Sequence, residues 1–138
     1  MIVLIPAYKP DESLVRLAQQ ITELDAHAEI LVVDDGSGST YVPIFTELVI
    51  RGVTIITHPV NRGKGAALRT GLAWARTHRS DHIVVTADAD GQHLPRDILR
   101  VGVKTERMAS IGTRALVLGA RTLPDTRAEL TEPAVPLR

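Results

Sequence analysis

Short, continuously apolar segments alternate along this 138-residue chain with segments of helical periodicity. The apolar segments, rich in Val, Ile and Leu, span residues 2–6, 29–34, 53–58, 82–87 and 114–119. Consecutive apolar residues are typical of strands that are buried on both faces. Helical patterns fall between them at 11–24, 41–50, 64–78 and 95–108. Strands that alternate with helices predict an α/β fold, with a mostly parallel sheet and helices on both faces.

Length and composition indicate which class of protein this chain belongs to and which kinds of partner it can bind. The chain fits one compact domain, and its sixteen basic and sixteen acidic residues cancel, so we expect no nucleic-acid partner. The absence of cysteine excludes disulfides and thiolate chemistry, and suits a reducing compartment such as the cytoplasm. The apolar runs are shorter than the roughly 20 residues that cross a bilayer. We therefore expect a cytoplasmic protein without a transmembrane segment, with a peripheral position at the membrane left open.

The periodic pattern ends after residue 121, where prolines become frequent. We expect residues 1–121 to form the domain and residues 122–138 to form a loop or an edge segment. The sequence leaves the oligomeric state open, including a homo-oligomer.

Polar clusters follow four of the predicted strands. They are Pro6-Ala7-Tyr8, Asp34-Asp35-Gly36-Ser37-Gly38, Asn61-Arg62-Gly63-Lys64-Gly65 and Asp88-Ala89-Asp90-Gly91-Gln92-His93. The carboxyl ends of parallel strands meet at one edge of the sheet, where open α/β sheets bind their ligands. We therefore expect the four clusters to face one crevice.

The aspartates of the fourth cluster indicate a metal site. Asp88 and Asp90 can converge on one hard cation, Mg²⁺ or Mn²⁺, and Gln92 can add a carbonyl oxygen. Magnesium usually takes one or two carboxylates together with substrate phosphates, so this sparse set suits a cation shared with a diphosphate. The alternative is that the aspartates only cap a turn or the next helix. His93 could be a ligand, a substrate contact or a solvated turn residue.

The second and third clusters indicate nucleotide contacts. Asp35 could accept a proton from a base, although an Asp-Gly turn needs no ligand. The third cluster opens a helix, where backbone amides, the helix dipole and Lys64 would attract a phosphate. It lacks the spacing of a P-loop, and its glycines could equally be ordinary loop residues.

Together the clusters resemble a known family. The ordered motifs P-A-Y, V-V-D-D-G-S, N-R-G-K-G-A-A-L, D-A-D-G-Q-H-x-P and L-G-A-R resemble glycosyltransferases of family 2, which have the GT-A fold, a Rossmann-like architecture. The form of the fourth motif looks most like the polyprenyl-phosphate sugar synthases, such as the dolichol-phosphate mannose synthases. The resemblance covers residues 2–121.

The resemblance implies a role for each matching residue. The donor, a nucleotide-diphosphate sugar, would be lined by Pro6, Ala7, Tyr8, Val33, Asp35, Lys64, Asp88 and Ala89. Asp35 would contact the base and Lys64 would lie near the diphosphate. Asp90 and Gln92 would bind the metal, with Asp88 close by or also a ligand. Asp90 and Arg121 would be catalytic, with Arg121 facing a phosphate near the reaction centre.

The implied chemistry is an inverting transfer of the sugar to an acceptor, for which a polyprenyl phosphate at a membrane surface is the candidate. Two departures from the family stand out. Pro10 occupies the position where the family usually has an acidic residue, and the chain ends about where the family's acceptor-binding half begins. A second hypothesis is therefore a truncated module that binds nucleotide sugar and metal without catalysis. A third, a nucleotidyltransferase, would require a Gly- and Arg-rich loop after the first strand, which Pro6-Ala7-Tyr8 is not.

Overall fold

A four-stranded parallel sheet forms the centre of the computed structural model, which describes residues 1–111, 115–116 and 135–136. The strands are β1 (Ile2–Ala7), β2 (Glu29–Asp34), β3 (Thr54–Thr57) and β4 (Val84–Thr86), in the order β3-β2-β1-β4. Four of the five predicted strands thus belong to this sheet. The α/β prediction is confirmed, including the parallel arrangement of the sheet.

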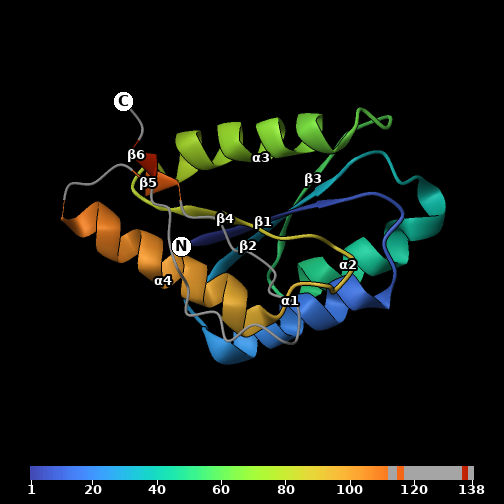
Figure 1. Ribbon diagram of the computed structural model, residues 1–138. Coiled ribbons are helices and arrows are strands. Elements are labelled where there is room, and N and C mark those ends of the chain that lie inside the picture. Colours follow the sequence, from blue (N-terminus) through green and yellow to red (C-terminus); the bar gives the residue numbers. More distant parts are fainter. Residues whose placement is uncertain (112–114, 117–134, 137–138) are drawn as a thin grey trace, which may run out of the picture.

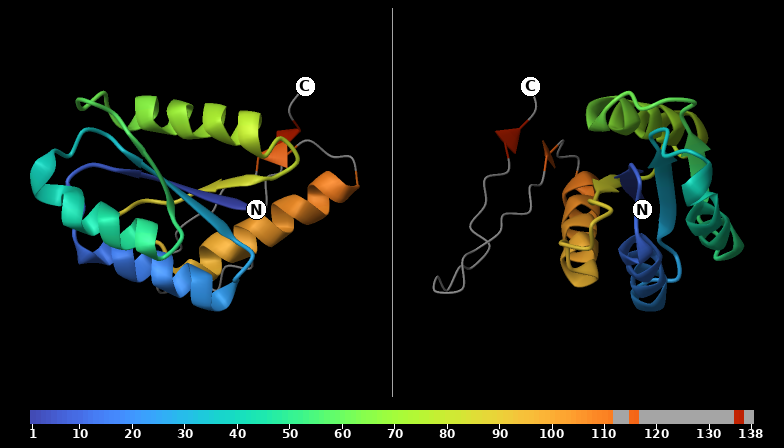
Figure 2. Two further views of the ribbon diagram at one scale, coloured as in Figure 1. Left: turned by 180° about the vertical axis from the view of Figure 1, so that it is seen from behind. Right: turned by 90° about the vertical axis from the view of Figure 1, so that its right-hand side faces the viewer.

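Helices cover both faces of the sheet, as Figures 1 and 2 show. They are α1 (Glu12–Leu24), α2 (Val42–Ile50), α3 (Lys64–His78) and α4 (Pro95–Ser110), and a short 3₁₀ helix, Ser39–Tyr41, precedes α2. In the view of Figure 1, α3 lies above the sheet, and α1, α2 and α4 lie below it. None of the helices in the described part of the chain is long and apolar enough to cross a membrane.

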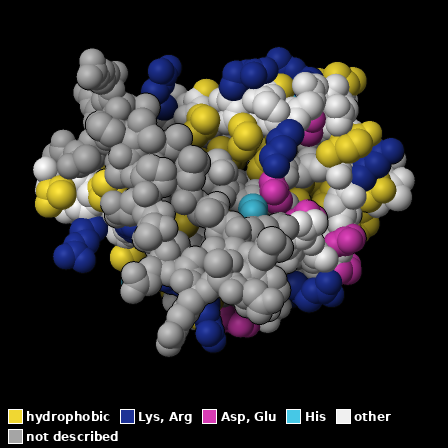
Figure 3. All heavy atoms as spheres, in the orientation of Figure 1, with side chains coloured by type: hydrophobic (Ala, Val, Ile, Leu, Met, Phe, Trp, Pro, Cys, Tyr) yellow, Lys and Arg dark blue, Asp and Glu magenta, His cyan; other side chains and the backbone are white. Residues whose placement is uncertain are grey.

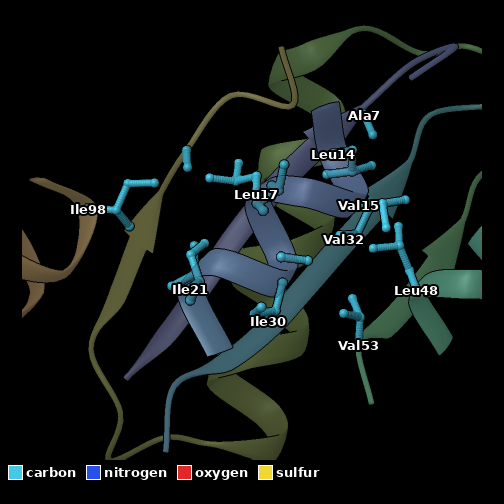
Figure 4. Packing of buried hydrophobic residues seen from close by; sticks show 14 of the residues in the cluster. Ala7, Leu14, Val15, Leu17, Ile21, Ile30, Val32, Leu48, Val53 and Ile98 are labelled. Carbon is cyan, nitrogen blue, oxygen red and sulfur yellow. The ribbon is translucent and has the colours of Figure 1, made fainter. Parts of the chain in front are cut away.

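Two apolar clusters hold these layers together. The larger cluster joins the sheet to α1, α2 and α4, and Figure 4 shows Leu14, Leu17 and Ile21 of α1 among its residues. The smaller cluster joins the other face to α3, through Leu4, Leu31 and Val33 of the strands and through Ala67 and Ala75 of the helix. Small residues on α3 let this helix approach the sheet closely.

Gly71 is the closest point of that approach. A Cβ atom at this position would lie 2.2 Å from Cδ1 of Leu4, a side chain that is itself fully buried. The helix therefore packs so closely on β1 that only glycine fits at residue 71. Any larger residue there would force the core to rearrange.

Three of the strand predictions need correction. The segment 82–87 was expected to be fully buried, but Thr86 of β4 is exposed and Val84 is only partly buried, because β4 is an edge strand that pairs with β1. The segment 53–58 was expected to be fully buried, but Thr54 and Thr57 of β3 are exposed and the two isoleucines between them are only partly buried. The reason is that β3 is the edge strand and pairs with β2. In the segment 114–119, the described residues Ala115–Leu116 form β5, which pairs antiparallel with β6 (Val135–Pro136) in a separate small sheet.

Candidate functional site at the carboxyl edge of the sheet

A pocket of about 510 Å³ lies at the carboxyl edge of the sheet. Its lining comes from the end of β1, from the segments that follow all four strands and from the start of α3. The lining residues are Pro6, Ala7, Tyr8, Lys9, Pro10, Asp11, Asp35, Asn61, Lys64, Ala67, Asp88, Ala89 and Asp90. The structure thus brings residues of all four predicted clusters to one hollow. Near the centre of the face seen in Figure 3, acidic, basic and histidine side chains lie next to one another.

Asp35 lies at the pocket but is almost completely buried, with 3% of its surface exposed. Its Oδ1 accepts hydrogen bonds from the Nδ1 group of His58 at 2.7 Å and from the backbone N–H of Arg62 at 2.9 Å. Its Oδ2 accepts one from the backbone N–H of Gly63 at 2.7 Å. Burial raises the pKa of Asp35, but these three hydrogen bonds outweigh it and hold the pKa below its ordinary value. Asp35 is therefore a carboxylate that fixes the loop before α3.

Two further contacts fix the loops that follow β1 and β2. The backbone N–H of Asp35 donates to the carbonyl of Ala7 at 2.8 Å. Lys9 has a positive φ of 48°, a left-handed conformation that is uncommon for lysine, and its N–H donates to Oγ of Ser37 at 2.8 Å. Two loops of the pocket are thus joined to one another.

Lys64 and Asp88 form an ion pair across the pocket, in which the lysine Nζ donates to Oδ1 of Asp88. Both side chains are accessible, with 61% and 36% of their surfaces exposed. An exposed ion pair contributes only about 0–1 kcal/mol to stability, so a ligand can replace it at little cost. His93 lies beside it: its Nδ1 accepts a hydrogen bond from the backbone N–H of Asp88 at 3.1 Å. His93 therefore supports the loop that carries the aspartates.

Asp90 lines the same pocket and also stabilises its own turn. Its Oδ1 accepts a hydrogen bond from the backbone N–H of Gln92 at 3.0 Å, the turn arrangement that the sequence left open as an alternative. No group of three or more Asp, Glu or His side chains in the described part of the chain could hold a metal by itself. Asp88 and Asp90 place two carboxylates at the pocket, and such a pair fits a Mg²⁺ or Mn²⁺ ion whose other ligands would be phosphate oxygens and water.

Two of the predicted site residues that the structure describes, Val33 and Gln92, do not line the pocket. Val33 is completely buried against α3, because side chains alternate along β2 and Val33 shares its face with Leu31. Gln92 lies in the turn after Asp90, outside the pocket lining. Arg121 lies outside the described residues, and so does the predicted boundary at residue 121.

A second hollow of about 450 Å³ lies between α2 and β3. Its walls are mostly apolar and include Val42, Phe45, Val49 and Ile55. Lys64 of the third motif and the carboxylates of the fourth line the 510 Å³ pocket instead, so that pocket is the candidate site.

The sequence patterns did not single out His58, which the structure places against Asp35 of the pocket. The available signal was its place directly after a strand, beside the segment that leads into the Asn61 cluster. Its buried contact with Asp35 depends on tertiary packing.

Comparisons with known proteins identify the family and the fold. Residues 2–117 match the family described as "Glycosyl transferase family 2". The chain is 34% identical over 113 residues to the UDP-N-acetylglucosamine–dolichyl-phosphate N-acetylglucosaminyltransferase of Methanococcus voltae, covering 72% of this chain and 44% of that protein. It is 30% identical over 126 residues to the polyprenol monophosphomannose synthase of Mycolicibacterium smegmatis, covering 89% and 45%.

The fold also resembles that of S. aureus TarS, with a TM-score of 0.63 and 16% identity over 90% of this chain and 38% of that one. This likeness supports the GT-A-like architecture. The chain spans less than half the length of each of these relatives. On the family match and the sequence identities together, the chain belongs to glycosyltransferase family 2.

Proposed function

We propose that the pocket binds a nucleotide-diphosphate sugar together with Mg²⁺ or Mn²⁺, and that the chain is the donor-binding part of an inverting glycosyltransferase. The acceptor in this proposal is a polyprenyl phosphate at a membrane surface. Support for the acceptor comes from the two curated relatives, whose names include dolichyl phosphate and polyprenol.

The single observation that carries the proposal is the meeting of Lys64, Asp88 and Asp90 in one pocket. A cation and two carboxylates in a shared hollow can hold a diphosphate and a divalent ion at the same time, because the ion screens the carboxylates from the phosphates. Asp88 and Asp90 would hold the metal. When bound, the metal supplies positive charge that stabilises the departing nucleotide diphosphate.

Different residues of the pocket would contact different parts of the donor. Lys64 would bind the diphosphate, and Tyr8, with 48% of its surface exposed, would form one wall for the nucleoside together with Pro6 and Ala7. Ala89 would lie on the ribose side. A polyprenyl phosphate is already an anion and needs no strong protein base to become a nucleophile. Arg121 stays a proposed phosphate contact near the reaction centre.

A second candidate function is a module that binds nucleotide sugar and metal without transfer. This candidate needs only the pocket groups that the structure describes, Lys64, Asp88 and Asp90. Incubation with nucleotide sugars, Mn²⁺ and a polyprenyl phosphate separates the two. Formation of a lipid-linked sugar supports the transferase, and binding without transfer or hydrolysis supports the module.

Ligand binding itself is tested by thermal shift with uridine and guanosine diphosphates and their sugars, with and without Mn²⁺. A ligand that binds only the folded state raises the melting temperature. We expect a metal-dependent shift with one of the two bases, and expect Asp90→Ala to abolish its metal-dependent part. Asp97→Ala, an exposed acid on α4, is the matched control. An absence of any shift in the unmodified chain would contradict the proposal.

A further inference from the structure

A buried chain of polar contacts runs from α3 to the loop before it, by way of β3 and β2. Oγ1 of Thr70 lies 2.8 Å from Nε2 of His58, and Nδ1 of His58 lies 2.7 Å from Oδ1 of Asp35. Asp35 in turn accepts the backbone N–H groups of Arg62 and Gly63. His58 is almost as deeply buried as Asp35, with 5% of its surface exposed. A hydrogen-bonded polar chain that is buried at its centre fixes one arrangement of the segments it joins.

The register of the sheet explains why His58 and Asp35 meet. Thr57, the last residue of β3, pairs with Asp34, the last residue of β2. The residues that follow these two strands, His58 and Asp35, therefore lie at the same level of the sheet. The backbone N–H of His58 also donates to the carbonyl of Asp34 at 2.8 Å. The rigid sheet therefore holds the imidazole against the carboxylate, and the carboxylate holds the loop.

The chemistry of the partners decides which ring nitrogen carries the proton. Asp35 is a carboxylate and can only accept, so Nδ1 of His58 must donate. In the neutral ring Nε2 then accepts from the hydroxyl group of Thr70. A carboxylate has about four acceptor directions, and three of those on Asp35 are taken by His58, Arg62 and Gly63. Most of the hydrogen-bonding capacity of Asp35 is thus committed within the chain.

We propose that His58 is a positioning residue of the donor pocket. Its Nδ1–H holds the Asp35 carboxylate in the orientation in which it fixes residues 62–63, and thereby sets the place of Lys64. This inference rests on the proposed function, because Lys64 is taken to bind the donor diphosphate. In this inference, Asp35 supports the phosphate side of the pocket. About one of its four acceptor directions then remains free to contact the base of the donor.

Two substitutions separate the role of each ring nitrogen. The side-chain nitrogen of asparagine can replace Nδ1 of histidine, and that of glutamine can replace Nε2. His58→Asn therefore keeps a donor for Asp35, and His58→Gln places its donor toward Thr70. Both remove the ring from the same site, so the loss of packing is similar. His27→Gln, at an exposed histidine in the turn before β2, is the control for the substitution itself.

The first measurement is the affinity of each full-length variant for a nucleoside diphosphate with Mn²⁺. His58→Gln leaves the Asp35 carboxylate without its side-chain donor and so loosens residues 62–63, and we expect this variant to bind at least roughly tenfold more weakly. His58→Asn should stay within about threefold of the unmodified chain. Equal affinities for the two variants would overturn the inference, whether both are weakened or neither.

The second measurement is independent of donor binding. In ¹⁵N NMR spectra, Nδ1 of His58 should carry a proton, and the amide signals of Arg62 and Gly63 should move in His58→Gln and keep their places in His58→Asn. The inference would be overturned by an Nδ1 that carries no proton. It would also be overturned if the amide signals of Arg62 and Gly63 had the same positions in both variants. If the unmodified chain binds no nucleoside diphosphate, the proposed function fails and these spectra still decide the role of His58.

Discussion

The ammonium group of Lys64 contacts the carboxylate of Asp88 across the pocket, and so joins the first residue of α3 to the loop after β4. The two residues are 24 positions apart in the sequence and belong to different motifs. Their contact shows that the third and fourth motifs lie at one pocket. Because both side chains are accessible, the pair is suited to exchange its internal contact for contacts with a ligand.

Replacement of Lys64 by alanine should weaken binding of a nucleoside diphosphate by roughly ten- to hundredfold, the effect expected when one charge-assisted hydrogen bond is lost. Affinity for the nucleoside alone should change little. Isothermal titration with both ligands checks this. Arg76→Ala, at an exposed basic residue near the end of α3, is the control, and equal losses for nucleoside and diphosphate would contradict the assignment of Lys64.

Removal of divalent metal should weaken diphosphate binding in the unmodified chain. The reason is that Asp88 and Asp90 lie in the pocket and repel the phosphates when no cation screens them. The double variant Asp88→Asn, Asp90→Asn should bind the diphosphate equally well with Mn²⁺ or with a chelator. A chelator effect of the same size in both proteins would argue against these two ligands.

Gly71→Ala should destabilise the chain by about 1–3 kcal/mol, the usual cost of forcing extra volume into a packed core. The added Cβ atom would meet the buried side chain of Leu4 at 2.2 Å. Gly65→Ala is the matched control in the same helix, since its nearest neighbour is the Arg69 side chain at 3.6 Å. Urea unfolding measures both, and the control should be neutral or stabilised by up to about 1 kcal/mol.

Acid should destabilise the unmodified chain more than the variant Asp35→Asn. The pKa of Asp35 in the folded state lies below its ordinary value of 3.8, so its contribution to stability is complete above pH 3.8 and is lost as the pH falls through the folded value. Asp35→Asn should be less stable at neutral pH and should lose less free energy of unfolding on acidification. Urea unfolding at neutral pH and below pH 3.8 measures the difference, and parallel pH curves would contradict it.

Much of the fold could be predicted from the sequence because its signals are local. Continuous apolar runs identified β1 and β2, and a stripe of small and apolar residues identified α3 with both of its ends. The helix expected at 41–50 begins at Val42, after a 3₁₀ turn, and the helix expected at 95–108 extends to Ser110. The position of each motif after a strand was enough to predict a shared edge, since parallel strands end on the same side.

What the sequence by itself determined was the order of strands and helices, and with it the edge at which the polar clusters gather. Only the tertiary structure decided the partner of each polar group: Asp35 with His58, 23 residues away, and Lys64 with Asp88. The same holds for Val33, which faces α3 and not the pocket, and for β3, which became an edge strand. Periodicity and propensity act over a few residues, whereas these pairings depend on strand register and on the seating of α3 against the sheet, which are settled only when the whole core packs.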